Sequence, residues 1–530
     1  MHVNKLPFLL LPLPSSTISS WLVLRNELFR KCLINNTRQN LINNTRHKSD
    51  SARCLVQSLG NNHRQPISNN HLSLTNNCIS NSNYRNLSRY SASTIMRPHT
   101  KAFSFNDYHV IGFDLDGTIL RYNLDEVVPM EHELLCRYLV EHKGYSNQLL
   151  AFLDKPCEMD FLQKGLFLDA ERGNVLKLDN NGYILKANHG TRTMTDSEIS
   201  NAYGCERKWS VTLQFINDPL CAWNGPLAEK MRSLLDYFDI SVSLVFAHAI
   251  DEIDAKRKLN NTTDQSPYNV WADILEALIH IYTRENFSNG KSGYFEKIKS
   301  QPDRYLLKTS PVVIDWLRKL KESNKKLFLL TGSHIDFANF TASYALGENW
   351  RDLFDVVICF ARKPGFFHAG REFHQIDGFR EADPINLDEN LEFNKVYSMG
   401  NWKQLQKAFA QSIDIDVSDM RSLYVGDNLI QDVYAPEALA GMDSLAISEE
   451  MLSESEESEL PNHFKKIIAS NYWESYFYED GVPTLWTHIV AKYSKMCVPT
   501  LEHAAAKPID YEFRMNNEIG FYPSPPVVVE

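Results

Sequence analysis

The sequence contains no pair of cysteines spaced as CxxC and no ladder of cysteines and histidines. Its nine cysteines are scattered along 530 residues, so their spacing indicates neither a zinc site nor a disulfide framework. Cysteines without such partners are typical of a reducing compartment, and we therefore expect a cytoplasmic protein.

Long hydrophobic runs are also missing. The longest strongly apolar run near the start covers residues 8–13 and is interrupted by Pro12. It is far shorter than the roughly 20 residues that span a bilayer. The sequence therefore predicts no integral membrane segment.

Acidic residues are scarce over residues 1–100, which contain only Glu27 and Asp50 among many Asn, Ser and Arg residues. Such a polar stretch cannot bury enough apolar surface to offset its loss of entropy, so we predict a disordered arm there. Its composition leaves a mitochondrial transit peptide open as an alternative, and Met96 is a second candidate start.

The formal net charge of -11 weighs against a surface built to bind nucleic acid. An anionic substrate would need cations placed locally, or a metal ion. Apolar residues make up 43% and charged residues 23%, which are the proportions of a folded globular protein. Whether the chain forms a homo-oligomer stays open at this stage.

From about residue 108, short apolar segments alternate with helical patterns, which predicts an α/β fold with a doubly wound parallel sheet. We expect strands in HVIGF before Asp114 and at 326–330, 356–360 and 422–425, and helices at 131–141, 312–323 and 337–345. The alternation is less regular near 155–300, where helices at 227–238 and 270–283 fit an inserted α+β cap. The expected units are the arm over 1–100, a catalytic core over 101–154 and 300–450, a cap over 155–299, and an acidic connector with a C-terminal segment over 451–530.

Two carboxylates follow the first predicted strand, in Asp114-Leu-Asp116-Gly-Thr. Residues two apart in an extended segment point to the same side, so both can face one metal ion and one phosphate. One carboxylate can accept a phosphoryl group while its neighbour acts as acid and base. Taken alone, such a pair is more often a turn or a helix cap.

Three further patterns follow in order, each at the end of an expected strand. Thr331-Gly332-Ser333 offers hydroxyls and backbone amides to phosphate oxygens, and Lys363 offers a fixed positive charge. Asp427 and Asp432 could complete an oxygen-rich Mg²⁺ site. The conjunction of the four patterns favours a phosphoryl-transfer site over separate turns.

These four segments resemble the signature motifs of the haloacid dehalogenase superfamily, and residues from about 108 to 525 are similar to the cytosolic 5'-nucleotidase group. RYNL at 121–124, KPGFF at 363–367, GFYPSPP at 520–526 and the stretch 165–191 add to that likeness. The resemblance implies that Asp114 is the nucleophile, that Asp116 is the acid/base, and that Lys363 balances charge. It also implies that Thr331 grips phosphate, and that Mg²⁺ binds Asp114, Asp427, Asp432 and the backbone carbonyl of Asp116.

The resemblance implies a nucleoside 5'-monophosphate as substrate, with Trp223 in the place of an aromatic that stacks on the base. An ordinary core or interface role for Trp223 is the alternative. Two rival functions also stay open. One is a phosphatase acting on another small phosphometabolite, and the other is a binding protein that retains the fold without useful turnover.

Overall fold

The computed structural model describes residues 103–151, 156–222, 227–260, 266–385, 392–453, 467–468 and 470–513. The predictions for the arm over 1–100, for the acidic stretch beyond Ser453 and for the ending at 520–526 lie outside these residues. Trp223 lies outside them as well. The expected domain boundaries therefore stay predictions.

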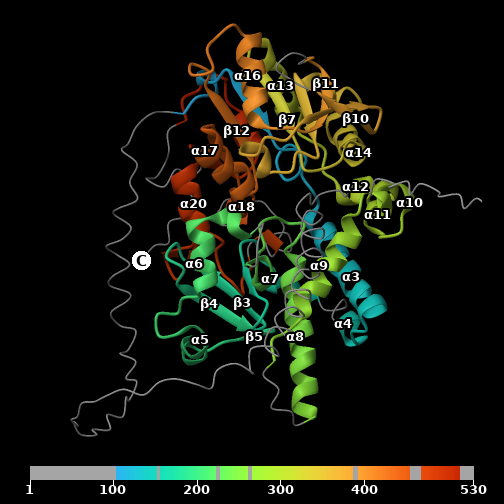
Figure 1. Ribbon diagram of the computed structural model, residues 1–530, viewed down its shortest axis with the longest axis vertical. Coiled ribbons are helices and arrows are strands. Elements are labelled where there is room, and N and C mark those ends of the chain that lie inside the picture. The colour runs from blue at the N-terminus through green and yellow to red at the C-terminus, as the bar shows by residue number, and fades with distance from the viewer. Residues whose placement is uncertain are drawn as a thin grey trace, which may run out of the picture. The chain divides into compact units, whose positions relative to one another are not determined.

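The main sheet has nine strands in the order β10-β9-β11-β8-β7-β1-β12-β13-β16 (Figure 1). Neighbouring strands are parallel from β11 to β16, whereas β9 is antiparallel to β11 and β10 to β9. The predicted α/β fold with a parallel sheet is confirmed. The strands are β1 Val110–Phe113, β7 Lys326–Leu330, β8 Val356–Cys359, β9 Phe373–Asp377, β10 Arg380–Ile385, β11 Lys395–Met399, β12 Ser422–Gly426, β13 Asp443–Ile447 and β16 Met496–Val498.

Strand β1 lies where the winding of the sheet changes direction. The chain adds β7, β8 and β11 on one side of β1, and later adds β12, β13 and β16 on the other. Ligands of open α/β sheets bind in the crevice at the carboxyl ends of the strands beside such a point. The two central strands pack closely, because a Cβ on Gly112 would lie 2.2 Å from the ring of Phe328.

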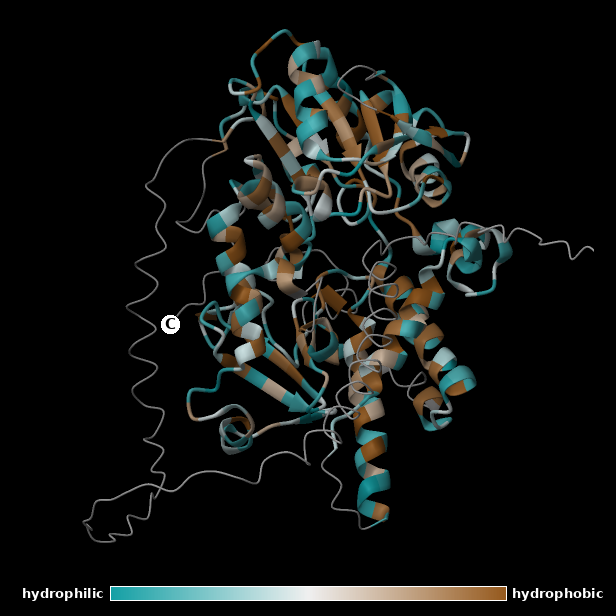
Figure 2. Cartoon of the chain, viewed as in Figure 1, coloured by the Kyte–Doolittle hydropathy of each residue, from teal (hydrophilic) through white to brown (hydrophobic). Residues whose placement is uncertain are grey.

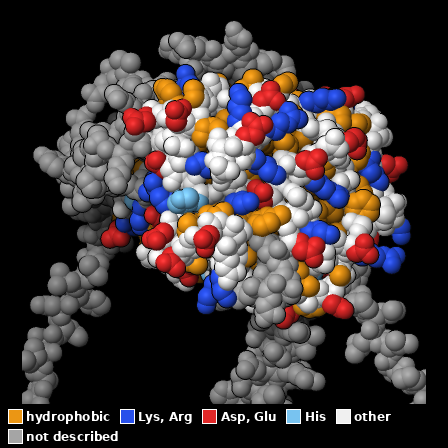
Figure 3. Space-filling view, turned by 90° about the horizontal axis from the view of Figure 1, so that it is seen from above, with side chains coloured by type: hydrophobic (Ala, Val, Ile, Leu, Met, Phe, Trp, Pro, Cys, Tyr) orange, Lys and Arg blue, Asp and Glu red, His pale blue; other side chains and the backbone are white. Residues whose placement is uncertain are grey.

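Helices cover the main sheet, and four of them are α13 Pro311–Glu322, α14 Ile335–Leu346, α16 Trp402–Ser412 and α17 Ala435–Ala440. Helix α13 begins with a capped turn, since the Ser310 side chain accepts a hydrogen bond from the amide of Val312 and Pro311 occupies the first position. The central strands β1, β7 and β8 are apolar and buried, as expected for strands covered on both faces, whereas β9 and β10 at one edge are more polar and more exposed (Figure 2). On the face in Figure 3, acidic and basic side chains are interspersed.

A second sheet is entirely antiparallel, with the strand order β5-β4-β3-β2-β6. Its strands are β2 Phe167–Asp169, β3 Asn174–Leu178, β4 Ile184–His189, β5 Arg192–Thr193 and β6 Met231–Ser233. Two short helices, α5 Asp196–Tyr203 and α6 Ser210–Asn217, follow β5, and three longer helices, α3 Leu124–Lys143, α8 Ser241–Leu259 and α9 Val270–Tyr282, pack on one another. The sheet with α5, α6, α8 and α9 gives the α+β insertion expected from the sequence, and α3, which precedes the expected insertion, packs against α8 and α9.

The helix predicted over residues 227–238 is wrong. The chain forms one helical turn, α7 Leu227–Lys230, and then enters strand β6, which pairs with β2. Met231 and Ser233 are buried on either side of the more exposed Arg232, which is the alternation of an edge strand. Pairing with β2 therefore outweighed the local preference for helix.

The segment after residue 470 joins the two sheets. It contains β14 Tyr478–Glu479, β15 Val482–Pro483, α20 Leu485–Tyr493 and, after β16, α21 Leu501–Ala505. Trp486 of α20 donates from Nε1 to the Gly165 carbonyl at 2.9 Å, and its ring stacks on Phe167 of β2. One hydrophobic cluster contains side chains of the second sheet, the main sheet and this segment. In the described part of the chain, no helix has both the length and the apolar character needed to cross a membrane.

Candidate active site

Asp114 follows the last residue of β1, and its backbone amide donates to the Val425 carbonyl of β12 at 2.9 Å. The chain then folds back, because the Gly117 amide donates to Leu120 and the Leu120 amide to Leu115. Gly117 has φ +77°, and a Cβ there would lie 2.5 Å from Asp427 Oδ2. The loop after β1 is therefore pressed against the loop after β12.

Asp114, Asp427 and Asp432 each place one carboxylate oxygen within 4.8 Å of the others. All three side chains are buried. Buried carboxylates at this separation repel one another, and burial together with nearby carboxylates raises the pKa of Asp427 well above its ordinary value. Oxygen ligands in such a group suit a hard divalent cation such as Mg²⁺.

Lys363 enters the same cluster from the loop after β8. Its Nζ lies 2.8 Å from Asp114 Oδ2 and 2.7 Å from Asp432 Oδ1, and it donates to the Tyr424 hydroxyl at 3.2 Å. Burial alone would lower the pKa of Lys363, but the two carboxylates raise it well above its ordinary value. The lysine is therefore charged, and it offsets part of the negative charge.

Asp116 faces a different set of groups. Its Oδ1 accepts a hydrogen bond from the Tyr122 hydroxyl at 2.7 Å, and its Oδ2 accepts from Ser333 at 2.8 Å and from Thr331 at 3.2 Å. Burial, followed by the charge of Asp114, raises the pKa of Asp116. A carboxyl group with a raised pKa can hold a proton and release it to a neighbouring oxygen.

The structure thus brings together Asp114, Asp116, Lys363, Asp427 and Asp432, as the sequence predicts. Thr331 and Ser333 lie at the same edge with Gly332 between them, but their hydroxyls contact Asp116 in this structure. Hydroxyl contacts to a bound phosphate therefore stay a prediction for both residues.

The family model described as "5' nucleotidase family" matches residues 99–472, which contain every carboxylate of the site. The human 5'-nucleotidase domain-containing protein 1 is 32% identical over 461 residues, covering 81% of this chain and 97% of that protein. This chain belongs to the 5'-nucleotidase family. The Bos taurus protein of the same name is 31% identical over 458 residues, covering 81% of this chain and 97% of that protein. Human 5'-nucleotidase domain-containing protein 2 is 25% identical over 337 residues, covering 62% of this chain and 58% of that protein.

This 5'-nucleotidase family member also carries a buried ion pair that sequence reasoning missed. Lys164 Nζ lies 2.8 Å from Glu450 Oε1, and the Tyr237 hydroxyl donates to the same oxygen at 2.7 Å. Burial and then the charge of Lys164 are the largest influences on the pKa of Asp427, so the lysine lies within electrostatic range of that carboxylate. No local signal marks Lys164, because its burial depends on residues far away in the sequence.

Tyr122 also lies at the site, where its hydroxyl donates directly to Asp116, and the sequence marks it only through the RYNL resemblance. A second unforeseen contact links the loop after β12 to the insertion, since Asn428 Nδ2 donates to Asp236 Oδ2 at 3.4 Å. Residues of the insertion therefore reach the edge of the main sheet that carries the carboxylates.

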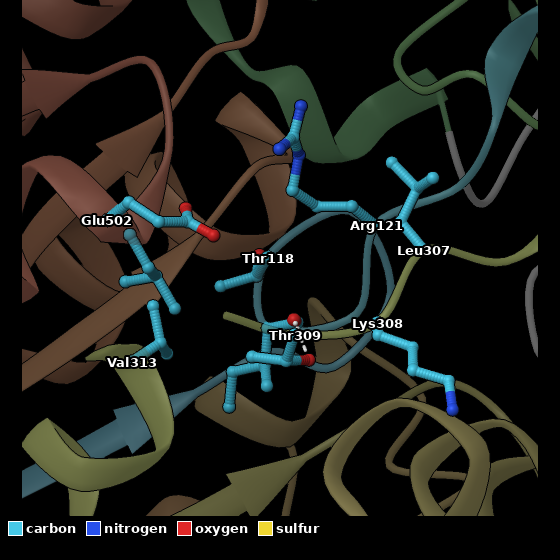
Figure 4. Close-up of a pocket in the computed structure, with 9 residues that line it drawn as sticks. Thr118, Arg121, Leu307, Lys308, Thr309, Val313 and Glu502 are labelled. Atoms are coloured by element: carbon cyan, nitrogen blue, oxygen red, sulfur yellow. Dashed lines mark hydrogen bonds between the residues drawn. The ribbon is translucent and has the colours of Figure 1, made fainter. Parts of the chain in front are cut away.

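A small cavity beside the loop after β1 is shown in Figure 4. Its volume is about 20 Å³, which is room for roughly one water molecule. Thr118, Arg121, Lys308, Thr309 and Glu502 line it, together with four apolar residues, and none of the clustered carboxylates does. The cavity is therefore too small, and wrongly lined, to be the substrate site.

Proposed function

We propose that this chain hydrolyses phosphate monoesters, with Asp114 as the residue that accepts the phosphoryl group and a nucleoside 5'-monophosphate as the substrate. The observation that carries the proposal is the convergence of Asp114, Asp116 and Lys363 with two further carboxylates at the carboxyl ends of parallel strands. Relatives named for a 5'-nucleotidase domain support the class of substrate.

The chemistry divides between the two carboxylates after β1. A carboxylate oxygen of Asp114 forms a bond to phosphorus while the ester oxygen leaves with the bonding electrons. Asp116 donates its proton to that oxygen, and then removes a proton from the water that attacks the Asp114 phosphate. The products are the alcohol, inorganic phosphate and the regenerated enzyme.

Charge around the phosphate is balanced by this chain's own groups and by a cation. Lys363 already contacts Asp114 and would neutralise part of the charge of the bound phosphate. Asp114, Asp427, Asp432 and the backbone carbonyl of Asp116 would hold Mg²⁺, and their buried oxygen donors fit that ion. When bound, Mg²⁺ supplies electrostatic stabilisation of the phosphoryl oxygens.

The proposal is tested by assaying a panel of phosphate esters with Mg²⁺ and with excess chelator. Wild-type protein should release phosphate only with the metal, and Asp114→Asn should abolish release. Asp116→Asn removes the acid/base, whose help is typically about 10² to 10⁴-fold, so a residual rate is expected with a good leaving group. Asp315→Asn, on the exposed face of α13, is the matched control.

Acid-quenched protein should carry a phosphoryl group on the peptide that contains Asp114. Labelling of another peptide, or full turnover by Asp114→Asn, would overturn the assignment of the nucleophile. Absence of turnover on every ester with Mg²⁺ would favour a binding protein.

A further inference from the structure

The carboxyl group of Asp116 is held by hydroxyl groups on both of its oxygens. Oδ1 accepts a hydrogen bond from Tyr122 at 2.7 Å, whereas Oδ2 accepts from Ser333 at 2.8 Å and from Thr331 at 3.2 Å. Among the described residues, no lysine or arginine forms an ion pair with Asp116, so these hydroxyls orient its carboxyl group. Each hydroxyl has a single proton to donate, and another acceptor can therefore compete for it.

The two contacts of Asp116 Oδ2 are open to such competition. Ser333 and Thr331 lie at the strand end where the proposed function places the phosphoryl group. A bound phosphate offers several charged acceptor oxygens, which would draw both hydroxyls away from Asp116. Proton donation requires the same change, because an oxygen that carries a proton for the leaving group acts as a donor itself. Phosphate binding would therefore free Oδ2 and leave the carboxyl group held at Oδ1.

Tyr122 is fixed independently of the phosphate site. It is 4% exposed, and its ring packs edge-on against Phe238, with centroids 5.0 Å apart and planes at 89°. Backbone hydrogen bonds of 2.9 and 3.0 Å tie residues 121–123 to residues 305–307 on the way to α13. The hydroxyl is thus held at Asp116 Oδ1 by a rigid ring on a paired backbone.

We propose that Tyr122 is the positioning residue of the acid/base Asp116, and that it alone holds this carboxyl group once phosphate has taken the hydroxyls of Thr331 and Ser333. This inference rests on the proposed function and adds to it the group that aims the proton at the leaving oxygen. The Tyr122 hydroxyl is engaged with Asp116, so its effect on the reaction passes through that residue.

The test compares kcat/KM for p-nitrophenyl phosphate with kcat/KM for the aliphatic phosphate ester that the wild type hydrolyses fastest, both with Mg²⁺. p-Nitrophenolate departs without a proton, whereas the oxygen of an aliphatic alcohol needs one as it leaves. A misplaced acid therefore slows the aliphatic ester more, and a displacement of about 1 Å can cost about 10²-fold. Tyr122→Phe should raise the ratio of p-nitrophenyl to aliphatic kcat/KM by about tenfold to 10²-fold.

Two further variants give the comparison its reference points. Tyr108→Phe is the matched control, because the Tyr108 hydroxyl also donates to a carboxylate, Asp443 at 2.9 Å, but lies at the opposite end of β1. It removes a buried phenol hydroxyl and should keep the wild-type ratio. Ser333→Ala should lower kcat/KM for both esters by one factor, because in the bound state its hydroxyl serves the phosphoryl group that they share.

Phosphorylated Asp114 provides a second readout on the same variant. Asp116 also takes the proton of the water that releases the phosphate, so its misplacement slows that step as well. With p-nitrophenyl phosphate, Tyr122→Phe should therefore accumulate more phosphoryl group on the Asp114 peptide of acid-quenched protein than the wild type does.

A merely structural role of Tyr122 would lower both kcat/KM values by the same factor, without this accumulation. That result would overturn the positioning role while the proposed function stands. A rise of the ratio in Ser333→Ala as large as in Tyr122→Phe would overturn the inference that Tyr122 alone holds Asp116. If the wild type hydrolyses no aliphatic ester with Mg²⁺, the proposed function fails and the positioning role falls with it.

Discussion

Replacing Lys363 with methionine should lower the free energy of unfolding, because the clustered carboxylates would lose the positive charge that offsets their repulsion. Lys363 is buried, and in the described part of the chain it is the cation that contacts Asp114 and Asp432, at 2.8 and 2.7 Å. Methionine keeps the length of the side chain but removes the charge. Asp114, Asp427 and Asp432 would then lie together with no cation between them.

Breaking a buried ion pair by removing one partner costs about 3–5 kcal/mol, and we expect a loss of that size in the free energy of unfolding. The loss should depend on pH. Burial raises the pKa of Asp432 to about 7 even with Lys363 present, and removal of the lysine would raise it further. Such a carboxyl group binds a proton more tightly in the folded state than in the unfolded state. The folding free energy that it costs is therefore small at low pH and grows as the pH rises through the folded pKa.

The assay is urea unfolding in chelator at about pH 8 and again at about pH 5.5, on either side of that pKa. Lys326→Met is the control, because the Lys326 Nζ lies 4.0 Å from a single carboxylate, Asp355, and such a pair is worth at most about 1 kcal/mol. Mg²⁺ should restore part of the stability of Lys363→Met, since a cation bound to the folded state alone stabilises it. A variant as stable as the wild type in chelator at the higher pH would refute the reasoning.

Three further outcomes follow from other residues. Gly117→Ala should lower kcat at least about tenfold and lower the free energy of unfolding by about 1–2 kcal/mol. The reason is that Gly117 has φ +77° and that a Cβ would clash with Asp427. Unchanged kinetics and an unchanged thermal midpoint would contradict this prediction. Burial lowers the pKa of His132 to about 4. The protein should therefore lose up to about 3 kcal/mol of its free energy of unfolding as the pH falls from about 6.5 toward 4. Unfolding curves of His132→Asn should show a weaker dependence of stability on pH. Lys177→Met should lower the free energy of unfolding by about 3 kcal/mol, because the Lys177 Nζ binds the Ser475 carbonyl at 2.7 Å and the Glu479 carboxylate. The same substitution should speed amide hydrogen exchange in residues 473–479. Unaltered exchange there would contradict this prediction.

The residues of the carboxylate cluster could be predicted from sequence because each follows a short apolar strand. In a parallel sheet all such strand ends lie at one edge, so Asp114, Lys363 and Asp432 meet although they are far apart along the chain. The position of Asp114 relative to Asp427 also depends on the tight turn at Gly117, which the sequence marks by glycine. Strand end and turn are local signals, and they were sufficient here.

The residues that complete the site from the insertion carry no such signal. Lys164 is indistinguishable in sequence from a solvated lysine, because its partner Glu450 is far away in the sequence, in the helix α18 Glu450–Ser453 that follows β13. The sequence pattern predicts a helix where strand β6 forms, since the strand is determined by pairing with β2 rather than by its own residues. Strand pairing and burial that depend on residues far apart in the chain leave no local pattern, so a single sequence does not predict them.

Under the proposed function, recognition of a phosphate ester has two parts, the phosphoryl group and the leaving group. The strand ends of the main sheet bring Asp114, Asp116 and Lys363 together, and the proposed function places there the phosphoryl group that every phosphate ester shares. The insertion reaches the same edge of the sheet through Asp236, which accepts a hydrogen bond from Asn428, and residues there would contact the group that departs. An interaction with the shared phosphoryl group changes kcat/KM for all esters by one factor, whereas an interaction with the leaving group changes the ratio between esters. Kinetic ratios thus separate the two sets of residues even if every substitution lowers activity.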